Sequence, residues 1–382
     1  MCQRGICIKK SMWEDITMKK IKIFLMLLFT FVLLIGFNVS VIAGEVYADH
    51  VAQLRELIIT LTEQRQEYST SYEHLSPLYI GTESDLLREL MDITIEAGTI
   101  LDNTRGYSSG VPIVISGFAE PCYIRDTFLI GFSNERYLEL LDLIIDFTGI
   151  PEEMIEIMVM GIISTDPTVG QPIDFDLPHT NEALPRNLSI PIGTRLMYWD
   201  AGSSRFILMG TLGHPRDSSG RTAFGTSHGW VPRGVNVFAA SGAHNGRQLG
   251  IVANSVFDPA AGIDVSYIRF EFGTIQTSAA GMNITSFFGS TGSGFPQRQV
   301  TVIGSGGNLR GNLIGLSSTF DIDTPNGVRR HNNMISANMA TQGGDSGAAL
   351  IQDGGIVLGT LVAGNGVNLS IYSQAPRYQH VR

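Results

Sequence analysis

Cysteine is nearly absent from this chain, which carries three cysteines among 382 residues, at positions 2, 7 and 122. Residues 1–17 have neither a helical pattern nor an export signal, so Met18 is the expected start and residues 1–17 an over-extended one. Cys122 is then the one cysteine that remains. A single cysteine makes neither a disulfide nor a structural zinc site, so an apolar core must hold the fold together. We expect no metal and no cofactor, and we expect Cys122 to be a small buried side chain rather than a nucleophile.

Long apolar runs are also missing, apart from one near the N-terminus. Three lysines precede an apolar stretch, Ile23–Ile35, and small residues around Ala43 and Ala48 follow it. A basic start, an apolar core and a small-residue exit are typical of a secretory signal peptide. The stretch is shorter than the roughly 20 residues that a membrane-spanning helix needs. Residues 18–48 are therefore expected to be a cleaved signal peptide of a secreted protein with no stable membrane anchor, the alternative being an uncleaved anchor.

Clustered basic charge is lacking too, and the scattered arginines argue against a nucleic-acid partner. Charge instead divides the chain near Arg186. Residues 49–185 hold 24 acidic residues and 6 arginines, whereas residues 186–382 hold 9 acidic residues and 14 arginines. This contrast predicts an acidic, helix-bearing unit at 49–186 and a loop-rich β domain at 187–382. Opposite charge either draws the two together or reflects an ordinary solvated surface.

The acidic unit has the pattern of an α+β domain. Apolar residues at helical spacing predict three helices, over 49–65, 84–97 with Ser84 as N-cap, and 133–147 with Ser133 as N-cap. Residues 123–131 and 154–163 are expected to be strands. No nucleotide-binding fingerprint accompanies them, so we assign this unit no chemistry of its own. The proline-rich stretch from Pro167 to Pro185 is expected to be a linker and a processing site.

Short β segments separated by glycine, asparagine and serine turns fill the second unit. Examples are residues 205–209, 236–240, 265–270, 299–303, 348–352 and 356–362. Many short strands at close spacing predict an antiparallel barrel or sandwich. The run Gly304–Gly307 is rich in glycine, but no helix pattern follows it, so a phosphate-binding loop is not expected there.

The stretch Gly343–Gly347 has the composition of a nucleophile turn. Its small residues leave the Ser346 hydroxyl exposed and let neighbouring N–H groups face a developing oxyanion. Ser346 needs a base, because a serine hydroxyl is a weak nucleophile at its free pKa. Among the histidines of the second unit, only His228 follows an apolar strand that ends in small residues. The others have polar, turn-like neighbours or lie at the chain end: His214, His244, His331 and His380.

The base in turn needs a carboxylate that fixes its tautomer and stabilises the imidazolium. Asp264 opens a strand of mixed burial, where a carboxylate can lie under the histidine, partly shielded from water. Asp258 is the competitor, but Pro259 follows it and indicates a turn. The candidate catalytic set is therefore His228, Asp264 and Ser346.

The order of these three residues and their local sequences resemble the chymotrypsin-fold serine proteases, in particular the bacterial secreted streptogrisin and α-lytic protease group. The likeness covers about residues 190–375. It implies two antiparallel β-barrels with the site between them, and hydrolysis of protein or peptide substrates through an acyl-enzyme. Ser346 would be the nucleophile, His228 the general base and acid, and Asp264 its orienting carboxylate. The N–H groups of Gly344 and Ser346 would form the oxyanion hole.

The resemblance also implies a propeptide and a specificity. Residues 49–186 would be a cleaved propeptide, an intramolecular partner that helps residues 187–382 fold or holds them inactive. Ala340 would lie at the base of the S1 pocket, with Val362, Ala363 and Gly364 along the strand that binds substrate. Since no carboxylate and no histidine falls there, we expect a medium-sized apolar P1 residue.

The chain departs from the family pattern at several points. Gly229–Trp230 follow the histidine where the family has a disulfide cysteine, and Ala348 replaces a second glycine. Val362 stands in place of a serine that supports the aspartate. Only 36 residues follow Ser346, so a short C-terminal helix is expected. The alternative to an endopeptidase is a catalytically silent secreted binding protein on the same fold, and a third possibility is a protease with one narrow target.

Overall fold

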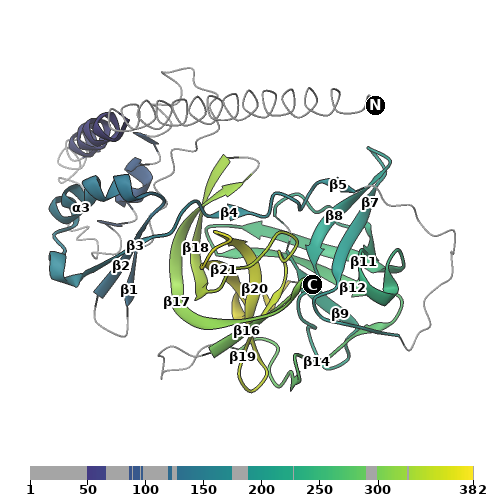
Figure 1. Cartoon of the computed structure of the whole chain (residues 1–382). Coiled ribbons are helices and arrows are strands. Elements are labelled where there is room, and N and C mark those ends of the chain that lie inside the picture. The colour runs from purple at the N-terminus through teal and green to yellow at the C-terminus, as the bar shows by residue number, and fades with distance from the viewer. Residues whose placement is uncertain are drawn as a thin grey trace, which may run out of the picture. The chain divides into compact units, whose positions relative to one another are not determined.

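The computed structural model describes residues 50–65, 86–87, 89–94, 96–97, 119–122, 127–173, 188–226, 228–289, 299–324 and 327–381 (Figure 1). The expected signal peptide, Cys2, Cys7, Ser84, the side chain of Cys122 and the part of the linker after Ile173 lie outside the described residues. The chain divides into two compact units, Met1–Thr60 and Leu61–Arg382. No described helix is both long enough and apolar enough to cross a membrane. The boundary near Arg186 stays a prediction.

The helices of the acidic half follow the predicted apolar spacing. Residues 50–65 are helical, with Val51, Leu54 and Ile58 buried, and residues 86–97 are helical wherever they are described. The third helix consists of a 3-10 segment, η1 (Glu135–Leu140), and α3 (Leu141–Thr148).

The caps of the third helix differ in part from the expectation. Its N-cap is Asn134 and not Ser133, because the extended backbone at Asn134 lets its side chain accept a hydrogen bond from the Arg136 N–H at 3.0 Å. Gly149 ends the helix in the left-handed conformation, with φ of 68°. The helix was predicted to end at residue 147 and ends at Thr148, and its N-cap lies one residue after the predicted Ser133.

A small sheet lies next to this helix in the sequence. It contains β1 (Ala119–Cys122), β2 (Thr127–Phe132) and β3 (Ile155–Val159), with β1 antiparallel and β3 parallel to β2. The short 3-10 segment η2 (Glu152–Met154) leads into β3. Strands are thus present in both predicted segments, 123–131 and 154–163: β2 continues one residue past the first, whose residues 123–126 lie outside the described residues, and β3 ends before the second does.

The chain after β3 forms two further short strands. Ser164–Thr165 form β4 and Pro172–Ile173 form β5, and both strands join the large sheets of the second half. The prediction of a linker is wrong for residues 167–173, because their backbone bonds to β8. The Gly170 N–H donates to the Leu208 carbonyl at 2.8 Å, and the Leu208 N–H donates to the Gln171 carbonyl at 3.1 Å.

The second half is built on two seven-stranded sheets (Figure 1). The first has the order β5-β8-β7-β10-β11-β12-β9. Its further strands are β7 (Arg195–Asp200), β8 (Arg205–Thr211), β9 (Thr222–Gly225), β10 (Asn236–Ala239), β11 (Gln248–Asp258) and β12 (Ile263–Phe270).

The second large sheet has the order β16-β19-β20-β21-β18-β17-β4. Because β16 also pairs with β17, the strands of this sheet other than β4 follow one another in a closed ring. Its further strands are β16 (Gln299–Gly304), β17 (Gly307–Thr324), β18 (Gly327–Asn338), β19 (Ala349–Gln352), β20 (Ile356–Gly364) and β21 (Ser370–Gln374). The predicted all-β character is confirmed, whereas the double barrel stays a prediction.

Short elements complete the chain. The strand β6 (Ser189–Ile190) pairs with β13 (Thr274–Ile275), and β14 (Ser278–Ala279) pairs with β15 (Met282–Asn283). A 3-10 turn, η3, spans Gly242–His244, and the short helix α4 spans Ala375–Tyr378.

Apolar packing joins these parts. One large cluster contains apolar side chains of the first large sheet together with Ile303 of β16, Ile351 of β19 and Tyr378 of α4. Another cluster packs Leu129 and Ile163 of the acidic half against Phe320 and Val362 of the second sheet. The acidic half therefore contributes side chains to the core beneath β17 and β20.

Candidate active site

His228 lies in the turn that follows β9. Its φ is 46°, in the left-handed region that few non-glycine residues adopt, so the surrounding structure must hold it there. The side chain is 4% exposed, and its ring stacks on Trp230 with 6.4 Å between the centroids. The turn thus presents a nearly buried imidazole in a fixed direction.

Asp264 holds this histidine at two points. One carboxylate oxygen accepts a hydrogen bond from the His228 backbone N–H at 2.6 Å and one from the Thr226 hydroxyl at 3.2 Å. The other lies 3.1 Å from Nδ1 of the ring. Since a carboxylate only accepts, Nδ1 carries the proton and Nε2 is the free basic nitrogen when the ring is neutral. Asp264 is fully buried in β12, deeper than its expected place at a partly shielded strand head.

Ser373 of β21 lies beside Asp264. The Asp264 backbone N–H donates to the Ser373 hydroxyl oxygen at 3.0 Å. Val362 itself is fully buried in the apolar cluster with Leu129 and Phe320. The aspartate therefore has a serine beside it that comes from a different strand.

Ser346 lies in the turn between β18 and β19, and it is 3% exposed. Thr211 of β8 holds this turn: its N–H donates to the Ser346 carbonyl at 2.6 Å and its hydroxyl donates to the Gly344 carbonyl at 2.5 Å. A Cβ on Gly347 would lie 3.0 Å from the Thr226 nitrogen, and Gly347 has φ of 95°. Glycine is required there because the turn lies directly against the segment that leads to His228.

Nε2 of His228 is buried and has no hydrogen-bond partner among the described residues. The structure thus brings His228 and Asp264 into contact and sets the Ser346 turn beside them, but the bond between Nε2 and the Ser346 hydroxyl is not formed. Such bonds are often long before substrate binds.

The N–H of Gly344 is occupied by the chain itself. The carboxylate of Asp166, from the segment after β4, accepts a hydrogen bond from this N–H. The main-chain carbonyl of Asp166 accepts a hydrogen bond from the Val169 N–H at 3.2 Å within its own turn. A negative oxygen therefore lies at a donor that was expected to bind an oxyanion.

The strand β4 carries Asp166 to this place. Ser164 and Thr165 pair antiparallel with Gly364 and Ala363 of β20. This is the β20 edge on which an extended peptide was expected to bind.

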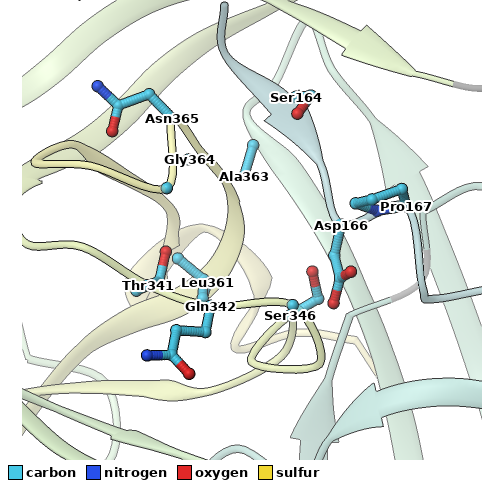
Figure 2. Close-up of a pocket in the computed structure, with 12 residues that line it drawn as sticks. Ser164, Asp166, Pro167, Thr341, Gln342, Ser346, Leu361, Ala363, Gly364 and Asn365 are labelled. Carbon is cyan, nitrogen blue, oxygen red and sulfur yellow. The ribbon is translucent and has the colours of Figure 1, made fainter. Parts of the chain in front are cut away.

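A cavity of about 170 Å³ remains beside Ser346 (Figure 2). Figure 2 shows the Ser346 hydroxyl and the Asp166 carboxylate on one side of it, and Thr341, Gln342 and Asn365 on the other. Its lining is completed by Ser164, Pro167, Gly343, Leu361, Ala363, Gly364 and Gly366. Asp166 is the one charged residue among the lining residues of this described pocket.

The four residues expected to bind substrate divide into two pairs. Ala363 and Gly364 line the cavity. Ala340 is exposed and Val362 lies in the core, and neither is among the lining residues. Thr341 and Gln342, which the sequence did not single out, line the cavity instead.

Two histidines differ from their expected turn-like setting. His214 is fully buried: its Nδ1 lies 2.8 Å from the Pro215 carbonyl, and its Nε2 lies 2.9 Å from the Tyr378 hydroxyl. Burial lowers the pKa of His214 to about 4. His331 lies fully buried in β18, where burial lowers its pKa and the charge of Asp264 raises it in part. The prediction was wrong because it rested on the polar sequence neighbours of the two histidines, whereas the side chains that bury them come from strands distant in the sequence.

The sequence also missed Asp166. Asp166 directly precedes Pro167, and in the sequence this position indicated a linker rather than the end of a strand. No group of three or more potential metal ligands occurs among the described residues.

No family model matches this chain, and no curated protein matches it. Solved structures do resemble it. A chymotrypsin from Cellulomonas bogoriensis is 18% identical with a TM-score of 0.36, covering 50% of this chain and 95% of its own. A protease from Nocardiopsis is 21% identical with a TM-score of 0.35, covering 49% and 93%. Protease A of Thermobifida fusca is 18% identical with a TM-score of 0.37, covering 50% and 96%. These neighbours are bacterial chymotrypsin-fold serine proteases.

Proposed function

We propose that this protein is a secreted serine endopeptidase that uses Ser346 as nucleophile, His228 as general base and acid, and Asp264 as the residue that orients His228. The observation that carries the proposal is the two-point hold of Asp264 on His228, at Nδ1 and at the backbone N–H. A buried carboxylate in this position fixes the tautomer that leaves Nε2 basic, which is what proton abstraction from a serine requires.

In the proposed reaction, Nε2 takes the proton of Ser346 as its hydroxyl oxygen attacks the substrate carbonyl. The carbonyl oxygen becomes an oxyanion, which the N–H groups of Gly344 and Ser346 stabilise. His228 then gives its proton to the leaving amine, and water repeats the sequence on the acyl-enzyme. Each oxyanion donor contributes roughly 3–4 kcal/mol to such a transition state.

Labelling with a fluorophosphonate tests this proposal. We expect the secreted, processed protein to label and the Ser346→Ala variant not to label. A correctly processed protein without label at Ser346 would instead support the catalytically silent binding protein.

The acidic half is proposed to hold the enzyme inactive until it is removed. Asp166 occupies the N–H of Gly344, and β4 covers the β20 edge, so a substrate has neither the oxyanion donor nor the strand to pair with. Because β4 and β5 are also strands of the two large sheets, residues 187–382 made alone would lack both. We therefore expect little active 187–382 to refold unless 49–186 is supplied in trans, and equal yields would reduce the acidic half to a spacer.

The proposed P1 preference is a medium-sized apolar side chain. The cavity beside Ser346 holds Leu361 and Ala363 but no acidic residue of 187–382. Cleavage of a peptide library tests this preference, and a dominant lysine or arginine at P1 would contradict it. Secretion is tested separately, by N-terminal sequencing of the exported protein, which we expect to begin after a cut near Ala43 or Ala48.

A further inference from the structure

The glycine-rich turn Gly304–Gly307 lies beside the nucleophile turn. It connects β16 to β17, and its N-terminal end contacts Asp345, the residue between Gly344 and Ser346. No role was predicted for this turn, because it is rich in glycine like a phosphate-binding loop but no helix pattern follows it.

The Asp345 carboxylate is buried and fully engaged by neutral donors. One of its oxygens accepts from the Ser305 N–H at 2.8 Å and from the Ser305 hydroxyl at 3.1 Å, and the other accepts from the Gln342 N–H at 3.0 Å. Asp345 is 3% exposed. Within the described part of the chain, it forms no ion pair. A buried carboxylate without a cation depends on such donors, because its charge is costly to bury.

Only glycine fits at the position before Ser305. A Cβ on Gly304 would lie 2.7 Å from the Asp345 Cγ, closer than side-chain atoms approach one another. Gly306, two residues on, is different. The nearest atom to a Cβ there would be the Gln342 amide oxygen, at 3.7 Å, which is ordinary contact. The close fit therefore belongs to Gly304 and not to the turn as a whole.

We propose that Gly304 and Ser305 are positioning residues for the oxyanion hole, acting through Asp345. The inference rests on the proposed function. Asp345 lies between the two residues whose N–H groups are the expected donors, so a shift of its carboxylate would rotate the peptide groups on either side. Thr211 holds the carbonyls of Gly344 and Ser346 from one side. The Gly304–Ser305 turn fixes Asp345 from the other.

Four variants of the full-length gene test the proposal, measured on the processed, secreted protein. Gly304→Ala is expected to lower kcat by about 10- to 100-fold, since a lost oxyanion donor costs about 10²–10³-fold in comparable enzymes. KM should change by less than about threefold, because the oxyanion hole stabilises the transition state more than the bound substrate. Gly306→Ala is the matched control and should keep wild-type kcat and KM. Ser305→Ala should lower kcat by less than Gly304→Ala, since the backbone N–H remains, and Ser305→Thr should restore it.

Fluorophosphonate labelling separates failure of the inference from failure of the function. If the wild type labels at Ser346 while Gly304→Ala matches Gly306→Ala in kcat, the inference is overturned and the function stands. If the wild type does not label, both are overturned. If Gly304→Ala does not accumulate, the two Ser305 variants test the proposal instead. A lower kcat in Ser305→Ala that Ser305→Thr restores supports it. Wild-type kcat in both variants overturns it.

Discussion

The carboxylate of Asp166 accepts a hydrogen bond from the backbone N–H of Gly344, a residue 178 positions further along the chain. The two come together because β4 pairs with β20, so the segment that delivers Asp166 is part of the second sheet. In the proposed enzyme this N–H stabilises the oxyanion of the transition state. A side-chain carboxylate resembles that oxyanion in charge but carries no scissile bond, so Asp166 would block the donor without being consumed.

Removal of this carboxylate should open the site in the uncut chain. A hydrogen bond to a charged group contributes about 1.5–3 kcal/mol, so Asp166→Ala should increase labelling of the full-length band by a fluorophosphonate by about 10- to 100-fold. Labelling of the full-length and processed bands is read separately on one gel. Glu153→Ala, which removes an exposed acidic residue of the same half, is the control and should leave labelling of the full-length band at the wild-type level. Equal labelling of the two variants would contradict the role of Asp166.

Replacement of the orienting carboxylate should abolish most of the activity. Asp264→Asn presents an amide to His228 and favours the wrong tautomer, so kcat is expected to fall by about 10⁴-fold, as in other enzymes with this arrangement. Asp258→Asn is the matched control: Asp258 is exposed and caps a turn by accepting from the Ala261 N–H at 3.1 Å. A comparable loss in both variants would mean that Asp264 has no special role.

Local signals account for much of the fold and for the candidate site. The strands at 205–209, 236–240, 265–270, 299–303, 348–352 and 356–362 were all predicted within a few residues, because short apolar segments between glycine turns favour strands. His228, Asp264 and Ser346 were each chosen from their immediate neighbours. The structure brings the first two into contact and sets the turn of the third beside Thr226.

Long-range pairing explains most of what the sequence did not indicate. β4 has two residues, too few for any periodicity, and its partner Gly364 lies 200 residues away. Ser373 reaches Asp264 from a strand 109 positions further on. The hydroxyl that satisfies His214 belongs to Tyr378, 164 residues away. Such contacts depend on the order of strands in a sheet, which the local pattern of one strand does not contain.

Acid should destabilise the fold through its buried histidines. The pKa of His214 is about 4 in the fold and about 6.5 in an unfolded chain. Between these values the unfolded chain binds a proton that folded His214 does not, so the free energy of unfolding falls as the pH drops from about 6.5 to 4, by up to about 1.4 kcal/mol per unit. His331, whose pKa is also lowered, adds a change of the same sign. Urea unfolding at several pH values measures how steeply the free energy of unfolding changes with pH. This change should be less steep for His214→Gln than for the wild type or for His380→Gln, which alters an exposed histidine. Equal pH dependence in all three proteins would exclude His214 as the cause.

Loss of the Tyr378 hydroxyl should cost more stability than loss of the Tyr372 hydroxyl, although both tyrosines are fully buried. Nδ1 of His214 faces a carbonyl and must carry the proton, so Nε2 accepts from Tyr378, whose oxygen in turn lies 2.7 Å from the Thr360 hydroxyl. Tyr378→Phe therefore leaves a buried nitrogen without a donor, at a cost of about 1–3 kcal/mol.

Tyr372 bonds to the Ser370 hydroxyl at 2.7 Å, but Ser370 keeps the Ala337 carbonyl as a second partner at 3.3 Å. Tyr372→Phe should thus cost less, and thermal unfolding of the two variants at pH 7 compares them directly. A larger drop in Tm for Tyr372→Phe would contradict this order and the cost assigned to the unpaired His214 nitrogen.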